Sequence, residues 1–283
     1  MADSVPITCS IGSEVTGLDL NRLDASALED LYRLLLDRGV LVFRNQELTH
    51  EAHVALAESF GPLTELHPMY PHVEGFPITR IRTDPAHPPE NEVWHSDLSC
   101  QVNPPFVSVL RDAVLPPVGG DTLWADLRAV YDSLPGALIE ELRDAEAEHT
   151  LAQGFRFVAG FGQNDRADAL TAATNTRADQ TRAVHRLFKR HPGSGRNVVY
   201  VNESFTTRIL NLDPKRSASV LADLFAAVRN PRFQVRMRWS PGTVVIWDNW
   251  ATQHFAVGDF FPHHEREVQR VTVASNARSG PFL

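Results

Sequence analysis

Cysteine, long apolar runs and clusters of positive charge are scarce in this chain of 283 residues, and each scarcity excludes a class of protein. The two cysteines, Cys9 and Cys100, make no disulfide framework and suit a reducing compartment, so we expect a cytoplasmic protein. No run of 18 apolar residues is present, which predicts that nothing spans a membrane. The first ten residues lack the basic and apolar regions of a signal peptide.

Acidic residues outnumber basic ones: 35 Asp and Glu stand against 27 Lys and Arg, a net charge of −8 at pH 7. Because no basic stripe is present, we expect no nucleic-acid partner. The chain also lacks a glycine-rich phosphate loop and a regular alternation of strands and helices. These two absences argue against a nucleotide-binding α/β fold.

The sequence does contain many short apolar segments with turn residues between them, and 43% of it is hydrophobic. Short strands with Gly/Pro turns and few helices predict an antiparallel sandwich or jelly roll, mainly β with flanking helices, in one domain over residues 1–283. Residues 7–20 suggest a hairpin. We expect helices near 24–35, 49–60, 127–148 and 217–228, and strands near 39–43, 106–110, 197–201, 233–239, 243–247 and 268–275.

Two segments are predicted to be loops that could act as mobile lids. Residues 63–91 are rich in Pro and His, and the part from 83 to 91 contains three prolines. Residues 153–182 are polar and rich in alanine, with weak signals of regular structure. Loops on a rigid scaffold commonly carry function.

A candidate metal site lies in the stretch Trp94-His95-Ser96-Asp97. Side chains alternate faces in an extended strand, so His95 and Asp97 would point the same way. One imidazole and one carboxylate leave most of an octahedral sphere open. A second imidazole brought in by the fold would complete a 2-His-1-carboxylate triad, the ligand set of non-heme Fe(II) oxygenases.

The His-x-acid spacing on its own is a weak signal, because it recurs at His72 and at His263. His72 follows Pro71 in a predicted loop, and His263 lies in a polar turn. Only His95 has an aromatic residue before it and a strand-like apolar run soon after it. Local evidence therefore leaves a metal site and a chance spacing both open.

Several ordered motifs together resemble the Fe(II)/2-oxoglutarate-dependent dioxygenases of the taurine dioxygenase family, over nearly the whole chain. The motifs are Ile11-Gly12-Ser13-Glu14-Val15-Thr16-Gly17-Leu18-Asp19-Leu20, His67-Pro68-Met69-Tyr70-Pro71-His72, Trp94-His95-Ser96-Asp97, Gly119-Gly120-Asp121-Thr122-Leu123-Trp124, Val201-Asn202-Glu203-Ser204-Phe205-Thr206-Thr207-Arg208-Ile209, Trp247-Asp248-Asn249, Thr252-Gln253-His254 and Arg266-Glu267-Val268-Gln269-Arg270-Val271-Thr272.

The resemblance implies a double-stranded β-helix with Fe(II) on His95, Asp97 and His254. It implies 2-oxoglutarate and O2 as cosubstrates, with the far carboxylate of 2-oxoglutarate on Arg266 and Thr122. A guanidinium suits that role because it binds a carboxylate through two hydrogen bonds. Family members are often dimers or tetramers, so a homo-oligomer is expected.

Two departures from the family pattern stand out. The family places ten residues between the distal histidine and this arginine, whereas residues 255–265 are eleven. Because the spacing from Arg266 to Thr272 is kept, we infer a one-residue insertion in the turn 260–265. Trp250 stands where an arginine is more usual.

The same resemblance predicts the substrate site. In taurine-degrading relatives a histidine, a tyrosine, a phenylalanine and an arginine surround the sulfonate, and they match His67, Tyr70, Phe205 and Arg270 here. A small anionic substrate is expected, a sulfonate such as taurine first of all. Hydroxylation of the carbon bearing the sulfonate would give an aldehyde, sulfite, succinate and CO2.

Other functions stay open at this point. Alkyl sulfate esters or aryloxyacetates are alternative substrates for the same mechanism. A cupin-like metal- or ligand-binding module without turnover is an alternative of another class, although such a module has no need for Arg266 and Thr122 opposite an open iron site. Structural zinc is disfavoured because it prefers four ligands that include cysteine.

Overall fold

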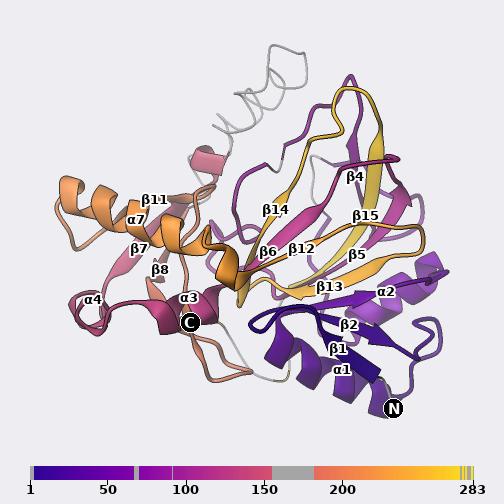
Figure 1. Cartoon of the computed structure of the whole chain (residues 1–283), viewed down its shortest axis with the longest axis horizontal. Helices are drawn as coiled ribbons and strands as arrows, with labels where there is room; N and C mark the ends of the chain where they lie inside the picture. Colours follow the sequence, from indigo (N-terminus) through magenta and orange to yellow (C-terminus); the bar gives the residue numbers. More distant parts are fainter. Residues whose placement is uncertain are drawn as a thin grey trace.

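The computed structural model describes residues 3–66, 70–90, 92–154, 182–274, 276, 278 and 282. Figure 1 shows two parts: packed sheets on one side and a lobe of helices and short strands on the other. The strands are β1 (Asp3–Pro6), β2 (Ser13–Thr16), β3 (Val40–Phe43), β4 (Thr79–Thr83), β5 (Val107–Val114), β6 (Thr122–Asp126), β7 (Glu146–Thr150), β8 (Arg182–Arg186), β9 (Phe188–Arg190), β10 (Asn197–Val199), β11 (Thr206–Ile209), β12 (Gln234–Met237), β13 (Val244–Asp248), β14 (Thr252–Ala256) and β15 (Arg266–Val273). The helices are α1 (Ala25–Arg38), α2 (His50–Glu58), α3 (Leu127–Ser133), α4 (Gly136–Glu141), α7 (Pro214–Val228) and the short 3-10 helix η2 (Pro231–Phe233).

Two sheets make the predicted jelly roll. The larger has seven strands in the order β1-β2-β3-β13-β5-β15-β4, and the smaller has the order β12-β6-β14. Between them lies an apolar cluster that includes Val42, Trp124, Met237 and Trp247. Neighbours in the sheets pair antiparallel except β2 and β3, which pair in parallel. The fold is therefore mainly β with helices outside, as predicted.

Strand β3 is buried on both faces, which explains why its sequence is a continuous apolar run. Val40 and Val42 belong to the cluster between the two sheets. Leu41 and Phe43 belong to the second cluster, which includes buried leucines of α1 and α2. Both faces of the strand are thus covered, and polar residues have no place on either.

The first two helices begin where their sequences predict. Asp24 Oδ1 accepts a hydrogen bond of 2.8 Å from the amide of Ala27, and Thr49 Oγ1 accepts one of 3.1 Å from the amide of Ala52. Each bond satisfies an amide that has no partner inside its helix. These helices lie against one face of the larger sheet (Figure 1).

One helix prediction was wrong at its end. Residues 127–148 were expected to be helical, but α4 ends at Glu141 and residues 146–150 form β7. This strand pairs with β8 on one side and with β11 on the other. The pairing partners come from far along the chain, and they override the helix preference of alanine and glutamate.

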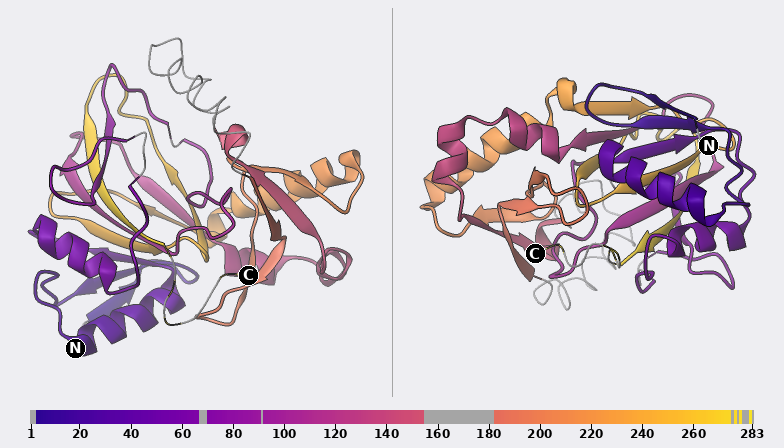
Figure 2. Two further views of the ribbon diagram at one scale, coloured as in Figure 1. Left: turned by 180° about the vertical axis from the view of Figure 1, so that it is seen from behind. Right: turned by 90° about the horizontal axis from the view of Figure 1, so that it is seen from below.

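The lobe beside the jelly roll contains α3, α4, α7 and the sheets β11-β7-β8 and β10-β9. Figure 2 shows that it lies at one side of the packed sheets, with the C-terminal end of the chain where the two parts meet. Among the described residues, no helix has the length and apolar character that crossing a membrane requires. Most of the segment 153–182 lies outside the described residues.

Candidate metal centre

His95 and His254 lie opposite each other as a pair of antiparallel residues. The amide of His95 donates to the carbonyl of His254 at 3.1 Å, and the amide of His254 donates to the carbonyl of His95 at 2.8 Å. His254 lies in β14, which β6 fixes by pairing. Ser96 adds a hydrogen bond of 2.8 Å from its Oγ to the carbonyl of Thr252. The backbone therefore places these two imidazoles side by side.

Three side chains converge at this point. The possible ligand atoms of His95, Asp97 and His254 all lie within 4.8 Å of one another. Asp97 Oδ1 is 3.9 Å from Nε2 of each histidine, and the two imidazole centroids are 4.1 Å apart. All three residues are buried. Two nitrogens and one carboxylate oxygen around one point are the donor set of a 2-His-1-carboxylate iron site.

Hydrogen bonds fix the tautomer of His95 and the orientation of Asp97. His95 Nδ1 lies 2.8 Å from the carbonyl of Val93, which can only accept, so Nδ1 carries the proton and Nε2 is left for a metal. Asp97 Oδ2 accepts from Ser108 Oγ at 3.1 Å, and Ser108 Oγ accepts from Asn249 Nδ2 at 3.1 Å. Trp247 Nε1 in turn donates to Asn249 Oδ1 at 2.8 Å.

The local charges favour a neutral imidazole pair and an ionised carboxylate. Burial lowers the pKa of His95 and of His254, in the second case helped by the neighbouring His95. Burial alone would raise the pKa of Asp97, but Arg270 and the two histidines hold it below its ordinary value. Metal ligands must be deprotonated, so this state is the one that binds a cation.

A second cationic group, Arg266, lies buried near the triad. Its guanidinium lies 5.5 Å from the ring centre of Trp239, and its Nη2 donates to Thr122 Oγ1 at 3.4 Å. Burial lowers the pKa of Arg266 to about 10. Among the described residues no carboxylate forms an ion pair with Arg266, and its buried Nε has no hydrogen-bond partner.

Thr122 lies beside this arginine and completes a set of donors. Its Oγ1 accepts from Trp239 Nε1 at 3.0 Å as well as from Arg266. With both lone pairs of the hydroxyl engaged, its proton is available for an incoming acceptor. A buried guanidinium without a carboxylate partner, next to a hydroxyl donor, fits the distal carboxylate of 2-oxoglutarate.

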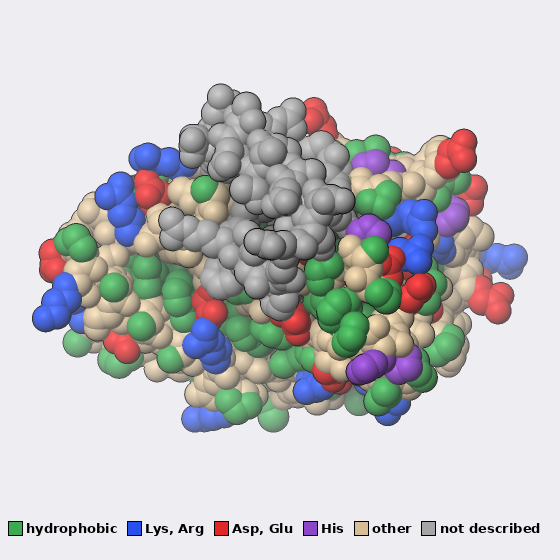
Figure 3. All heavy atoms as spheres, turned by 90° about the horizontal axis from the view of Figure 1, so that it is seen from above, with side chains coloured by type: hydrophobic (Ala, Val, Ile, Leu, Met, Phe, Trp, Pro, Cys, Tyr) green, Lys and Arg blue, Asp and Glu red, His purple; other side chains and the backbone are tan. Residues whose placement is uncertain are grey.

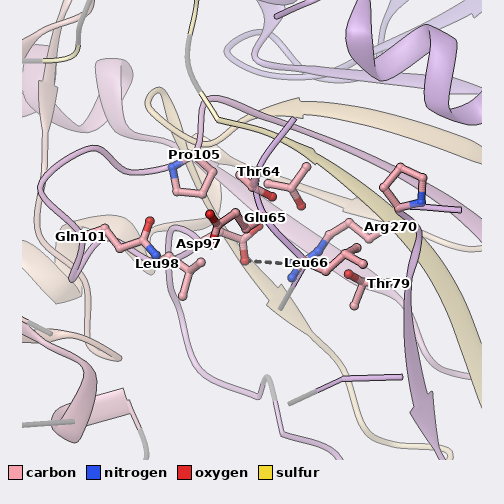
Figure 4. A pocket seen from close by; sticks show the side chains of 11 residues that line it. Thr64, Glu65, Leu66, Thr79, Asp97, Leu98, Gln101, Pro105 and Arg270 are labelled. Carbon is pink, nitrogen blue, oxygen red and sulfur yellow. Dashed lines mark hydrogen bonds and ion pairs between the residues drawn. The ribbon is translucent and has the colours of Figure 1, made fainter. Parts of the chain in front are cut away.

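Two cavities meet at Arg270. The smaller, about 40 Å³, is lined by both histidines, Thr122 and Arg266. The larger, about 150 Å³, is shown in Figure 4. There Arg270 Nη1 donates to Asp97 Oδ1 at 2.9 Å. The walls of the larger cavity are Thr64, Glu65, Leu66, Pro77, Thr79, Leu98, Gln101, Pro105 and Thr272.

Strand alternation explains why both arginines face inward. Arg266, Val268 and Arg270 are two residues apart along β15, so they share one face of it, and all three line the smaller cavity. Glu265 just before the strand is exposed and accepts from Arg82 Nη2 at 3.1 Å. Arg266, rather than Glu265, therefore faces the histidines despite the longer turn.

Of the predicted substrate residues that it describes, the structure places only Arg270 in these cavities. Arg270 lines both cavities. Tyr70 donates to Glu90 Oε2 at 3.0 Å, and Phe205 packs against Gly154; neither residue lines these two cavities. His67 lies outside the described residues. Figure 3 shows basic and histidine side chains exposed on the face of the molecule seen from above.

The predicted loop at 83–91 has a defined turn in its first part. The amide of Asp84 donates to the carbonyl of His87 at 3.0 Å, and His87 Nδ1 lies 2.8 Å from Asp84 Oδ1. Glu92, just beyond it, accepts from the amide of Gly258 at 2.7 Å. This contact ties the segment before His95 to the turn after β14.

Several residues around the site were not predicted. Ser108 is one polar residue within the apolar start of β5, a pattern that could have singled it out. Asn249 and Trp239 offered no such local signal, because their contacts depend on strand pairing between distant segments. The sequence predicted the triad and both arginines, but not the side chains that orient them.

The jelly roll and the site define a class: a facial triad with a buried arginine beside it belongs to non-heme iron oxygenases. A family model described as "Taurine catabolism dioxygenase TauD, TfdA family" matches residues 3–272. An alkylsulfatase from Acinetobacter baylyi is 30% identical over 277 residues, covering 97% of this chain and 85% of that protein. An alpha-ketoglutarate-dependent sulfate ester dioxygenase from Pseudomonas putida is 31% identical over 282 residues, covering 98% and 91%.

Solved structures agree with this match. A taurine dioxygenase from Burkholderia xenovorans superposes with a TM-score of 0.81 at 31% identity, covering 99% of this chain and 93% of that one. The chain belongs to the TauD, TfdA dioxygenase family. It is an Fe(II)/2-oxoglutarate-dependent dioxygenase that uses Fe(II), 2-oxoglutarate and O2.

Proposed function

We propose that this dioxygenase holds Fe(II) on His95, Asp97 and His254 and hydroxylates a small sulfonate, taurine being the first candidate. The observation that carries the ligand assignment is the convergence of the three buried donors within 4.8 Å. Three ligands on one side of the metal leave positions for a chelating 2-oxoacid and for O2. The bound iron supplies the oxidising chemistry, and the protein supplies position and shelter from water.

The buried pair Arg266 and Thr122 is proposed to hold the distal carboxylate of 2-oxoglutarate. The guanidinium is buried and has no acidic partner among the described residues, so an anionic ligand would neutralise it. This arrangement distinguishes an oxygenase from a cupin-like binding module, which has no use for a carboxylate site beside the metal.

Arg270 is proposed to bind the anionic end of the substrate, together with His67. It is the cation that lines the 150 Å³ cavity next to Asp97, among the residues that the structure describes. Sulfonate oxygens accept several charge-assisted hydrogen bonds, which a guanidinium can donate. Tyr70 and Phe205 stay predicted substrate contacts. One domain over residues 1–283 also stays a prediction. A dimer or tetramer stays a prediction as well, and light scattering would measure it.

The proposed reaction consumes one O2 for each substrate. One oxygen atom enters succinate as 2-oxoglutarate loses CO2, and the other becomes a hydroxyl on the carbon that bears sulfur. A carbon with both a hydroxyl and a sulfonate then breaks its C–S bond: the hydroxyl loses its proton, an aldehyde forms, and sulfite leaves with the bonding electrons. The protein's own task is to hold the C–H bond and the cosubstrate in place.

Alkyl sulfate esters are a second candidate, for two reasons. Two of the relatives at 30–31% identity are described as an alkylsulfatase and a sulfate ester dioxygenase. In addition, Leu66, Pro77, Leu98 and Pro105 give the larger cavity an apolar wall that suits an alkyl chain. Hydroxylation beside the ester oxygen would release sulfate and an aldehyde.

One experiment tests these proposals together. Iron-loaded protein is incubated with 2-oxoglutarate, O2 and a panel of sulfonates, alkyl sulfates and aryloxyacetates, and succinate, sulfite and sulfate are measured. Substrate-dependent succinate with sulfite supports the sulfonate proposal, whereas sulfate release selects the ester. His95→Ala should abolish iron binding and turnover, and full activity in that variant would refute the ligand assignment.

A further inference from the structure

Phe282, the last described residue of the chain, lies in a cage of aromatic rings. Its ring stacks on Trp250 with centroids 4.9 Å apart and planes at 9°. Tyr200 meets it edge-on at 4.8 Å, and His191 lies 6.2 Å away. Phe282 is only 5% exposed. A side chain from the far end of the sequence is thus buried among residues of distant segments.

On one side, Phe282 contacts the turn that leads into the strand of His254. Trp250 belongs to this turn between β13 and β14, four residues before the histidine. Its Nε1 donates to the carbonyl of Pro104 at 3.1 Å, and its ring packs on Phe106 at 4.6 Å. Pro104 and Phe106 belong to the segment that runs from Asp97 into β5. Trp250 therefore connects the two segments that supply the ligands.

On its other side, Phe282 contacts a buried lysine. Lys189 Nζ donates to the carbonyl of Phe282 at 2.7 Å and lies 4.0 Å from the centre of its ring. Lys189 Nζ also lies 3.3 Å from His185 Nδ1. His185 Nε2 reaches the carbonyls of Ser99 and Gln101, at 2.9 Å and 3.1 Å.

These carbonyls belong to the turn directly after Asp97. Leu98 in this turn has a φ of 45°, a left-handed conformation that costs a non-glycine residue free energy, and Leu98 and Gln101 both line the larger cavity. Such a conformation persists only when its surroundings fix it. The hydrogen bonds from His185 are contacts of that kind. Lys189 in turn contacts His185, and Phe282 contacts Lys189.

We propose that Phe282 is a positioning residue of the dioxygenase, which fixes the turn after Asp97 through Lys189 and His185 and the turn before His254 through Trp250. The proposal rests on the proposed function of the triad. Beside the paired backbone hydrogen bonds of His95 and His254 and the bond from Ser96, the amide of Asn249 donates to the carbonyl of Phe106 at 2.8 Å, so the two ligand segments are already tied at several points. Phe282 adds packing that keeps their spacing.

The proposal predicts a selective loss. Contacts that orient metal ligands typically change metal affinity 10- to 100-fold, so Phe282→Ala should weaken binding of Co(II), a redox-stable probe, by about 10-fold. The KM for substrate should rise, because Leu98 and Gln101 line its cavity. The KM for 2-oxoglutarate should stay within threefold, because β15 and β6 hold Arg266 and Thr122 by strand pairing.

The test is a Co(II) titration of metal-free protein, followed by visible absorption, for four variants. Lys189→Met keeps the apolar stem but removes the bond to Phe282, and it should weaken Co(II) binding in the same direction. Phe282→Ala removes the ring but keeps the backbone carbonyl, so the two single variants share only the contact of Lys189 Nζ with the ring. The double variant should therefore lose somewhat less than the sum of the two single losses. Leu224→Ala, a buried position on α7, controls for lost stability and should leave Co(II) affinity unchanged.

Two results would overturn the proposal. Parent-like Co(II) affinity and substrate KM in both Phe282→Ala and Lys189→Met would show that this packing does not reach the site. Equal weakening in Leu224→Ala would show a general effect of stability. A failure of the proposed function is distinguishable, because in that case His95→Ala would bind Co(II) as tightly as the parent.

Discussion

Replacing Arg266 with methionine should separate what this arginine does for the fold from what it does for 2-oxoglutarate. Burial lowers its pKa from 12.5 to about 10, so at pH 7 the folded protein holds a cation that would be better hydrated in the unfolded chain. A difference of that size corresponds to roughly 3 kcal/mol against folding. This penalty is present below pH 10 and is relieved as the pH rises toward 12.5.

Arg266→Met removes this penalty along with the hydrogen bond to Thr122, which contributes about 1 kcal/mol. The metal-free variant should therefore be as stable as the parent, or more stable by about 2 kcal/mol, in urea denaturation. Removing one partner of a buried charge pair costs about 2–5 kcal/mol. The KM for 2-oxoglutarate should accordingly rise by roughly 30-fold to several thousand-fold.

The assay is succinate formation at varied 2-oxoglutarate, beside urea curves of the metal-free proteins. Arg82→Met is the matched control: Arg82 lies on neighbouring β4 but is partly exposed and paired with Asp84 and Glu265. It should change neither the KM for 2-oxoglutarate nor the stability by more than about 1 kcal/mol. A parent-like KM in Arg266→Met, or a large loss of stability, would refute the reasoning.

Three further outcomes are expected. Arg270→Ala should raise the KM for substrate by about 100-fold or more and leave that for 2-oxoglutarate nearly unchanged; the reverse result would exchange the roles of the two arginines. Gly120→Ala, with φ of +72° and an added Cβ 3.1 Å from Arg266 Cδ, should destabilise by about 1–3 kcal/mol and raise the KM for 2-oxoglutarate. Gly75→Ala has a similar φ of +78° but open space around its Cβ, so it should cost the backbone strain of about 1 kcal/mol and leave that KM unchanged. Burial lowers the pKa of His53 to about 4, so the unfolded chain binds more protons between pH 6.5 and 4, and stability should fall as the pH drops through this window. Urea curves at pH 7.5 and 5 should show a smaller difference for His53→Leu than for the parent.

Local signals in the sequence predicted the parts of the fold that local interactions decide. The first two helices begin near the predicted residues, where Asp24 and Thr49 cap them, and β3 is buried on both faces as its apolar run indicated. The prediction of a helix over residues 127–148 was wrong at its end, because distant residues decide the structure there. Its last residues become β7 through pairing with β8 and β11, and no window of sequence contains those partners.

The site residues also divide into those that sequence patterns indicate and those whose contacts depend on distant segments. The spacing of His95 and Asp97 made them candidates but left a chance pattern open, and the resemblance carried by the ordered motifs singled them out and added His254 and the arginines. The chain of hydrogen bonds from Trp247 through Asn249 to Ser108 arises only when β5 and β13 meet in register. The packing of Phe282 on Trp250 likewise joins residues that no local window of sequence contains. Such contacts require the three-dimensional fold.

The turn between Val257 and Glu265 joins strands of two different sheets. His254 is fixed in β14 by β6, and Arg266 is fixed in β15 by β4 and β5. Each residue is thus placed by its own neighbours rather than by the length of chain between them. Asp259 and Gly258 make contacts to Gly120 and Glu92, and the amides of His263 and His264 donate to the carbonyl of Phe260, so the turn is bonded mostly within itself and to its immediate surroundings. A change in the length of this turn should therefore leave the positions of His254 and Arg266 unchanged, because neighbouring strands hold each of them.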